Sequence, residues 1–114
     1  MKNCIFCKII KGEIETDFLF ENERIIALKD IHPAAPVHIL IIPKTHIETI
    51  NEVDDTNYAV VGEMIMTAKL LASQYGLTEP GYRLVFNCNK DAGQEVFHIH
   101  LHLLGGRPFK WPPG

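Results

Sequence analysis

The feature that most constrains this chain is a stretch near its C-terminal end in which histidine and apolar residues alternate. Between Gln94 and Gly106, histidine occupies every second position at His98, His100 and His102. The residues that alternate with them are apolar: Phe97, Ile99, Leu101 and Leu103. A period of two is typical of a β-strand, whose side chains point alternately to opposite faces. The pattern predicts a strand with one face on the core and three imidazoles on the other, about 7 Å apart.

Three histidines in a row on one strand favour a chemical role. Histidine titrates near neutral pH, so it can serve as nucleophile, base, acid or metal ligand. A strand fixes the mutual geometry that such roles require. A metal site using all three imidazoles is one alternative, and a solvated strand face that happens to be rich in histidine is another. The register with the apolar residues disfavours the solvated face, and Gly105-Gly106 is expected to end the strand.

This stretch resembles the motif of the histidine triad (HIT) family, His-x-His-x-His followed by apolar residues. Its nucleoside phosphoramidase branch is similar at three further places: Gly93-Gln94 before the triad, Gly105-Gly106-Arg107 after it, and Trp111-Pro-Pro-Gly114 at the end. The resemblance covers essentially the whole chain. It implies an α+β fold in which an antiparallel sheet of about five strands is joined by one long helix and a short N-terminal helix.

Size and composition are those of one soluble globular domain over residues 1–114, with an extended proline-rich tail at 107–114. The net charge of −3 creates no positive field for nucleic acid or an anionic membrane, so neither is an expected partner. No apolar run reaches membrane length, and no signal peptide is visible. Three cysteines are an odd number, so we expect no framework of structural disulfides. We expect a cytoplasmic protein.

Local patterns predict the remaining elements. A short helix at 5–11 is closed by Gly12, and one long helix runs from Asp54 or Asp55 to Gln74, with Asp55 as its N-cap and Gly76 at its end. The expected strands are 18–21, 24–29, 36–43 and 82–87, and a tight turn joins the first two.

The pair Cys4-x-x-Cys7 is the second motif with chemical content. A redox disulfide would be expected after a strand in a βαβ unit, and no strand precedes Cys4. Zinc needs two further ligands, which histidines can supply, and His46 is one candidate. The family resemblance implies His98 as the other, which gives a structural Cys4, Cys7, His46 and His98 site. The alternative is two inert cysteines on a short helix.

The resemblance also implies which residues bind a purine nucleotide. Apolar side chains suit a flat base, and the matching positions are Ile5, Phe6, Ile9, Ile14, Leu28, Ile31 and Leu40. The aspartate at position 30 would accept hydrogen bonds from the ribose hydroxyls, although capping the following turn is its simpler interpretation.

Phosphate contacts are implied for Asn87, Gly93, Gln94 and Glu95. Glu95 departs from the pattern, because many members carry serine there. A carboxylate beside a phosphate is unfavourable unless it turns away, so Glu95 instead meets a cationic leaving amine in one interpretation. The backbone carbonyl of His38 would orient the nucleophile, and His32 is expected on the surface. Trp111 would cross to the partner subunit of a homodimer and shape its site.

The function implied is hydrolysis of a purine nucleoside 5′-phosphoramidate through a nucleotidyl-histidine intermediate. His100 would attack phosphorus, His102 or a neighbouring group would help stabilise the charge as the amine departs, and His98 completes the triad. No organic cofactor is expected, and no acidic cluster near the triad calls for Mg²⁺. Two alternatives stay open: a dinucleoside polyphosphate hydrolase, which the Gly-Gly-Arg and Trp-Pro-Pro-Gly ending disfavours, and a nucleotide-binding scaffold with incidental turnover.

Overall fold

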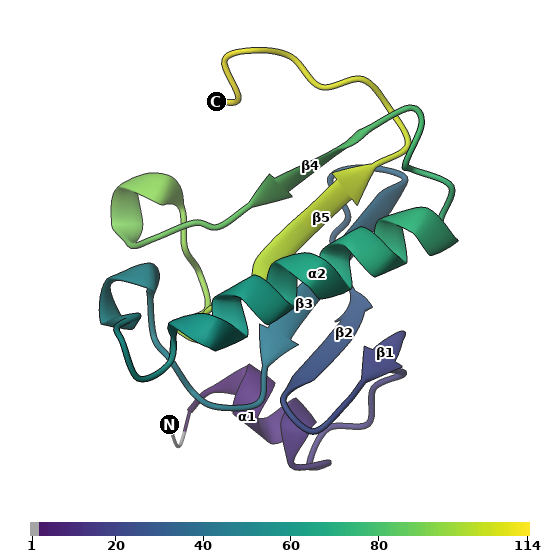
Figure 1. Ribbon diagram of the computed structural model, residues 1–114. Coiled ribbons are helices and arrows are strands. Elements are labelled where there is room, and N and C mark those ends of the chain that lie inside the picture. Colours follow the sequence, from purple (N-terminus) through teal and green to yellow (C-terminus); the bar gives the residue numbers. More distant parts are fainter. Residues whose placement is uncertain (1–2) are drawn as a thin grey trace.

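A computed structural model describes residues 3–114 and contains one antiparallel sheet between two helices of unequal length (Figure 1). The five strands are β1 (Phe20–Glu21), β2 (Ile25–Lys29), β3 (Val37–Pro43), β4 (Tyr82–Val85) and β5 (Leu101–Gly105), in the order β1-β2-β3-β5-β4. The helices are α1 (Ile5–Ile10) and α2 (Tyr58–Gln74). The predicted fold class is therefore confirmed. No helix in residues 3–114 is long and apolar enough to span a membrane.

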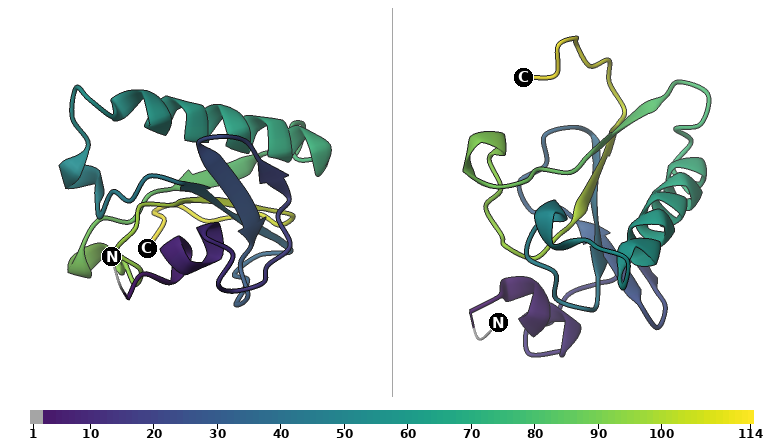
Figure 2. Two further views of the ribbon diagram at one scale, coloured as in Figure 1. Left: turned by 90° about the horizontal axis from the view of Figure 1, so that it is seen from below. Right: turned by 60° about the vertical axis from the view of Figure 1, so that its left-hand side comes forward.

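The two helices cover opposite faces of the sheet (Figure 2). On the α2 side, alternate residues of the central strands form the larger core with the buried helix face, as with Ile39, Leu103 and Met64. On the α1 side, the residues of opposite parity form a smaller core with Phe6 and Ile9. The central strands are therefore buried on both faces, which is why their sequences read as nearly continuous apolar runs.

The histidine stretch is less regular than its alternation predicts. Strand β5 begins only at Leu101, and residues 94–100 leave the sheet, where the Ile99 N–H donates to the Ile47 carbonyl at 2.7 Å. Two expectations are corrected: Phe97 is 44% exposed, and the ring of His98 is completely buried. Within β5 the alternation holds, because Leu101 and Leu103 pack under α2 while His102 points to the α1 face.

The glycine pair closes β5 as predicted. A Cβ on Gly105 would lie 2.6 Å from the Leu77 side chain, so only glycine allows this approach. Gly106 has a φ of +93°, in the region that favours glycine.

The long helix starts later than predicted. Asp54 accepts hydrogen bonds from the N–H and the hydroxyl of Thr56, at 2.8 and 2.6 Å, which fixes a turn before the helix. Asn57 then takes the N-cap position, so the prediction of Asp55 as N-cap was wrong. The helix ends as expected, with Gly76 at a φ of +73°.

Candidate active site and metal cluster

A cavity of about 270 Å³ opens on the α1 face of the sheet. One wall is apolar and the opposite end is polar, which suits a ligand with a flat base and a phosphate. Its lining includes most of the predicted substrate residues: Ile5, Phe6, Ile9, Leu28, Asp30, Ile31, Leu40, Asn87, Gly93, Gln94, Glu95, His100 and His102.

Three predicted substrate residues lie elsewhere. Ile14 lines a separate hollow between α1 and the following loop, because the chain turns away from the sheet after Gly12. His38 lies buried beside His102, and Trp111 is 84% exposed in the C-terminal tail.

The cavity also includes Lys29, His32 and Val96, which were not predicted to line it. His32 is exposed, as expected of a surface residue, yet it stands at this opening. Val96 lies two residues before His98, so the alternation in the sequence already placed it on the same face as the three histidines.

The imidazole of His100 is held in one orientation by the main chain. Its Nδ1 lies 2.8 Å from the carbonyl oxygen of His98, so Nδ1–H donates and Nε2 is left as the unprotonated nitrogen. The Phe6 ring packs edge-on against it, with centroids 5.1 Å apart. Burial lowers the pKa of His100 below its ordinary value, so the ring stays neutral at pH 7. His100 therefore presents a nucleophilic nitrogen to ligands in the cavity.

The carbonyl that orients His100 belongs to His98, and the prediction that His38 provides it was wrong. The His38 carbonyl instead accepts the N–H of Asp30 at 3.0 Å. The reason is local: residues 94–100 do not join the sheet, so the carbonyl two residues before His100 is available to its ring.

His38 contributes through its side chain. The Ala34 N–H donates to its Nδ1 at 3.0 Å, so the proton of the neutral ring sits on Nε2. Nε2 then donates to Nδ1 of His102 at 2.9 Å, and the Asp30 carboxylate lies 3.5 Å from the same nitrogen. His102 consequently carries its own proton on Nε2. Asp30, His38 and His102 are close enough to share a metal ion, but the proton on His38 Nε2 makes this a hydrogen-bond chain.

The polar end of the cavity is held by Gln94, which is 7% exposed. Its Oε1 accepts the Asn89 N–H at 2.8 Å, and its Nε2 donates to the carbonyls of Glu48 and Val96 at 2.8 and 3.1 Å. Both polar atoms of the side chain are thus engaged in fixing the loop, so the implied phosphate contact of Gln94 is not available to its amide. Gly93, with a φ of +80°, allows the tight turn that ends the loop.

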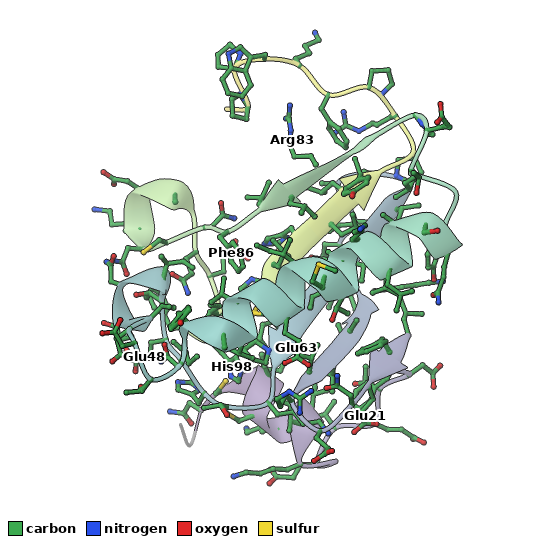
Figure 3. The ribbon with its side chains drawn as sticks, viewed as in Figure 1. Glu21, Glu48, Glu63, Arg83, Phe86 and His98 are labelled. Carbon is green, nitrogen blue, oxygen red and sulfur yellow. The ribbon has the colours of Figure 1, made fainter. Side chains whose placement is uncertain are left out.

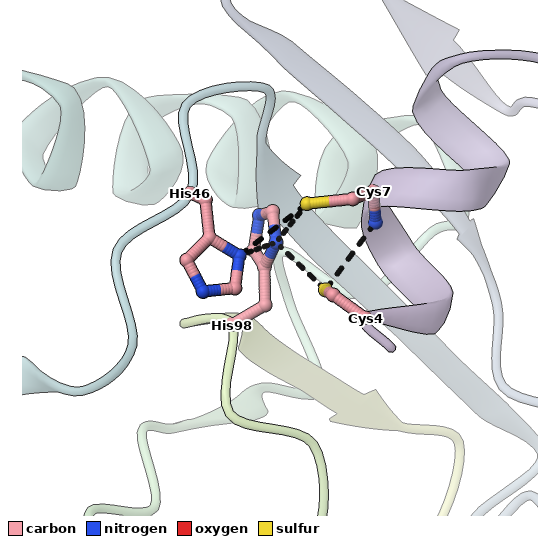
Figure 4. Close-up of side chains that lie close together, drawn as sticks. All are labelled: Cys4, Cys7, His46 and His98. Carbon is pink, nitrogen blue, oxygen red and sulfur yellow. Dashed lines mark hydrogen bonds between the residues drawn. The ribbon is translucent and has the colours of Figure 1, made fainter. Parts of the chain in front are cut away.

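Four potential metal ligands from three segments converge at one point (Figure 4). Nδ1 of His98 lies 3.3 Å from Cys4 Sγ, 3.6 Å from Cys7 Sγ and 3.1 Å from Nδ1 of His46. Cys7 Sγ is also 3.3 Å from Nδ1 of His46, and all four ligand atoms lie within 4.8 Å of one another. The predicted set of Cys4, Cys7, His46 and His98 could therefore hold a metal ion.

The outer contacts of this metal cluster favour ligation. Nε2 of His98 lies 2.7 Å from the Pro43 carbonyl oxygen, so Nε2–H donates and leaves Nδ1 unprotonated toward the sulfurs. Its ring, labelled in Figure 3, is completely buried and packs edge-on against the Phe6 ring of α1, with centroids 5.8 Å apart. A nitrogen already engaged in this way cannot be the nucleophile, which separates His98 from His100 and His102 in role.

Acid is expected to destabilise the fold through two of these rings. Burial lowers the pKa of His98 and of His102 to about 4, from an ordinary value near 6.5. Between these pH values the unfolded chain binds more protons, so the contribution to stability is complete above pH 6.5 and is lost as pH falls toward 4. The loss totals a few kcal/mol, because one pKa unit is worth about 1.4 kcal/mol and partial solvent contact screens His102.

Denaturant unfolding of chelator-treated protein at pH 7 and pH 5 measures this effect. The midpoint should be clearly lower at pH 5, with an unchanged slope. Equal midpoints would contradict the burial argument.

Comparison with known proteins agrees with this geometry. Residues 11–109 match the HIT domain family. The purine nucleoside phosphoramidase of Escherichia coli is 50% identical over 104 residues, which is 91% of this chain and 87% of that protein.

Two solved structures share the fold closely. The HIT family hydrolase of Legionella pneumophila superposes with a TM-score of 0.95 at 57% identity, covering 98% of this chain and 100% of the other. The HIT family hydrolase of Clostridium thermocellum superposes with a TM-score of 0.91 at 50% identity, covering 94% of this chain and 93% of the other. The family match, the 50% identity to a relative and the superposed fold agree, and the chain belongs to the HIT domain family.

Proposed function

We propose that this protein hydrolyses purine nucleoside 5′-phosphoramidates, breaking the P–N bond between an AMP-like phosphate and an amine. The observation that carries the proposal is the orientation of His100, whose Nε2 is unprotonated and borders the cavity while Nδ1–H is held by the His98 carbonyl. The similarity to the E. coli purine nucleoside phosphoramidase supports the substrate class.

The reaction proceeds in two steps. His100 Nε2 attacks phosphorus, the P–N bond breaks, and the amine leaves with the electron pair and takes up a proton. Water then attacks the nucleotidyl-histidine and restores the free imidazole. His102, neutral at pH 7 because its pKa lies near 4, directs Nε2–H at the reacting phosphoryl group and stabilises the charge that develops there.

The rest of the cavity binds the nucleotide. Phe6, Ile9 and Leu28 form the wall for the base, and Asp30 accepts hydrogen bonds from the ribose hydroxyls. Its Oδ1 already accepts the His32 N–H at 2.8 Å, which fixes the carboxylate. Asn87 and the backbone at Gly93 and Glu95 stand at the phosphate end.

The direct test is incubation of the protein with an adenosine 5′-phosphoramidate, with amine release and AMP measured. A rapid quench should also capture nucleotide covalently bound to His100, detectable by peptide mass spectrometry. Steady amine release without any covalent nucleotide would contradict the two-step mechanism.

His38 is expected to act as a positioning residue for His102. In His38→Ala the donor to His102 Nδ1 is lost, so the tautomer is no longer fixed and kcat should fall about 100-fold, within the usual range for proton-transfer groups. KM should change little, because His38 does not line the cavity. His38→Gln supplies an N–H donor and should recover part of the rate. A rise in KM with an unchanged kcat would point to a packing role instead.

Zinc is the metal we propose for the Cys4, Cys7, His46 and His98 cluster. Two thiolates and two imidazoles are a common structural zinc set. A tetrahedral zinc with bonds of about 2.3 Å to sulfur and 2.0–2.1 Å to nitrogen separates its ligand atoms by about 3.3–3.8 Å. Four of the six separations between ligand atoms in this cluster are 3.1–3.6 Å, close to that range, and all are within 4.8 Å. Zinc would supply structural cross-linking here, with no part in the two chemical steps.

A homodimer is part of the same proposal. The outer side of α2 and strand β4 expose apolar side chains around a hollow of about 460 Å³, among them Met66, Leu70 and Tyr82. The tail is ordered by Phe109, which lies between the guanidinium groups of Arg83 and Arg107 at 5.1 and 4.4 Å (Figure 3 labels Arg83). It presents Trp111 84% exposed, a position that a partner subunit would cover.

Sedimentation at micromolar concentration tests the dimer. The wild type should sediment as a dimer, and Leu70→Glu should shift it to a monomer, because a charge would be buried in an apolar interface. Ile14→Glu is the matched control, since Ile14 is exposed to a similar extent on the α1 side. A wild-type monomer, or equal effects of the two variants, would contradict the proposed interface.

The match over residues 11–109 supports one histidine triad domain for residues 1–114, with 107–114 as its tail. A cytoplasmic location is proposed because Cys4, Cys7 and Cys88 are free thiols, which reducing compartments preserve. We expect neither nucleic acid nor a membrane as a partner.

A further inference from the structure

Helix α1 belongs to the metal cluster and to the nucleotide cavity at once. Cys4 and Cys7 supply two of the four ligands, while Ile5, Phe6 and Ile9 line the cavity. These residues span less than two turns, so the ligands and the cavity wall cannot move independently. A change at the two sulfurs is therefore transmitted directly to the wall that contacts the base.

Two contacts extend this link to the nucleophile. The ring of Phe6, 6% exposed, packs edge-on against His98 and His100 with centroid distances of 5.8 and 5.1 Å. His98 places Nδ1 in the metal cluster while its carbonyl oxygen accepts Nδ1–H of His100. The ligand set and the nucleophile thus share His98 as a common residue.

The position of α1 depends on attachments beyond the helix itself. Six residues are too few for a helix that is stable alone. Its attachments are the buried side chains of Phe6 and Ile9 and the cross-link that a metal makes between Cys4, Cys7 and the two histidines. Losing the cross-link would leave the apolar contacts and weak sulfur–imidazole contacts to hold the wall in place.

The sulfur of Cys4 is also reachable from solvent, whereas Cys7 is buried. Cys4 is only half-buried, and a hollow of about 270 Å³ lined by Cys4, His46 and Glu48 opens beside the metal cluster. Ile5, Glu95 and Val96 line both this hollow and the nucleotide cavity. A small oxidant can enter without unfolding the protein. The sulfurs of Cys4 and Cys7 lie within 4.8 Å of each other, so local adjustment of α1 is enough to join them.

We propose that Cys4 and Cys7 form a thiol switch that sets the affinity of the nucleotide cavity. The inference rests on the proposed nucleotide binding and on metal binding by the cluster. With both thiolates on the metal, α1 is fixed against His98 and His100 and the base wall is complete. A peroxide converts the pair to a disulfide, the metal ion leaves, and α1 loosens.

The chemistry balances with hydrogen peroxide as oxidant. One thiolate attacks the peroxide, the O–O bond breaks, and with one proton the products are a sulfenic acid and water. The second thiol attacks that sulfur, the S–S bond forms, and a second water leaves. Each sulfur is oxidised by one electron, and the peroxide takes up both. Two of four metal ligands are consumed, so the ion is released.

The test compares AMP affinity by calorimetry in zinc-loaded reduced protein, in the same protein after hydrogen peroxide, and after dithiothreitol with added Zn²⁺. Peroxide should form one Cys4–Cys7 disulfide by mass spectrometry, release zinc to a chromogenic chelator, and raise the Kd for AMP about tenfold, a typical coupling between sites. Dithiothreitol and Zn²⁺ should reverse all three changes. By reciprocity, saturating AMP should raise the zinc affinity of the reduced protein by the factor by which zinc raises the affinity of that protein for AMP.

Two variants sharpen the comparison. Cys88→Ser should respond to peroxide like the wild type, because Cys88 lies outside the metal cluster. Cys4→Ser/Cys7→Ser should bind AMP weakly with or without peroxide. The peroxide experiment on the wild-type protein remains informative even if this variant does not fold.

Disulfide formation with zinc release but an AMP affinity unchanged within about twofold would overturn the switch, while leaving the metal site and the nucleotide site in place. Failure to form the disulfide would overturn it as well. If the zinc-loaded reduced protein does not bind AMP before any oxidation, the proposed function itself fails. That measurement therefore separates failure of the function from failure of the switch.

Discussion

Replacing His100 by alanine is expected to reduce phosphoramidate hydrolysis by at least about 10⁴-fold in kcat, a loss of the size seen when an enzyme's nucleophile is removed. The physical reason is that His100 lines the cavity while the His98 carbonyl holds its Nδ1–H, which leaves Nε2 unprotonated on a ring whose pKa is lowered by burial. His98 is engaged with the Pro43 carbonyl and the metal cluster, and His102 carries its proton on Nε2, so neither can substitute. Amine release from an adenosine phosphoramidate is the measurement.

Binding of AMP provides the control for this variant. The base wall and Asp30 are untouched by the substitution, so the Kd for AMP should change by less than about fivefold. Retained binding with lost turnover identifies His100 as a catalytic residue. Equal slow release of amine by wild type and variant would instead indicate a nucleotide-binding scaffold whose turnover is incidental.

The double substitution Cys4→Ser/Cys7→Ser should remove bound zinc, from about one ion per chain to a trace, when purified protein is analysed for metal. It should also lower thermal stability. A ligand present at a thousandfold over its Kd stabilises the folded state by about 4 kcal/mol. For a domain of this size each kcal/mol is worth roughly 3–5 °C, so Tm should fall by about 10–20 °C.

Cys88→Ser is the matched control for this experiment, because it removes a thiol that lies outside the metal cluster. Its zinc content and Tm should equal those of the wild type. If the double variant kept its zinc, the ligand set of Cys4, Cys7, His46 and His98 would be wrong, and the four side chains would be packing partners only.

The strands and helices were largely predictable because each depends on local patterns. The period of two and the β-branched residues predicted β3 and β5, and Gly76 and Gly105 marked where elements end. Local patterns failed where a neighbouring interaction competed with them. Asp54 fixes a turn through Thr56 and delays the long helix to Tyr58, and residues 94–100 leave the sheet although their alternation continues.

The candidate site was predictable in its residues and less so in their roles. The family resemblance identified His100, Asp30 and the ligand His98, the C-x-x-C pair pointed to the rest of the metal ligands, and the structure brings each set together. It also separates Ile14 from the cavity and turns the amide of Gln94 into a loop support.

Within the regular strands, the sequence alone shows which residues share a face, because side-chain direction there follows from the backbone period. Only the tertiary structure decided which nitrogen of each histidine carries a proton. That depends on the Pro43, Ala34 and His98 backbone groups, which pack against the rings from other segments or an irregular turn. A hydrogen bond is set by distance and direction in three dimensions, and no spacing along a chain encodes either until the chain has folded.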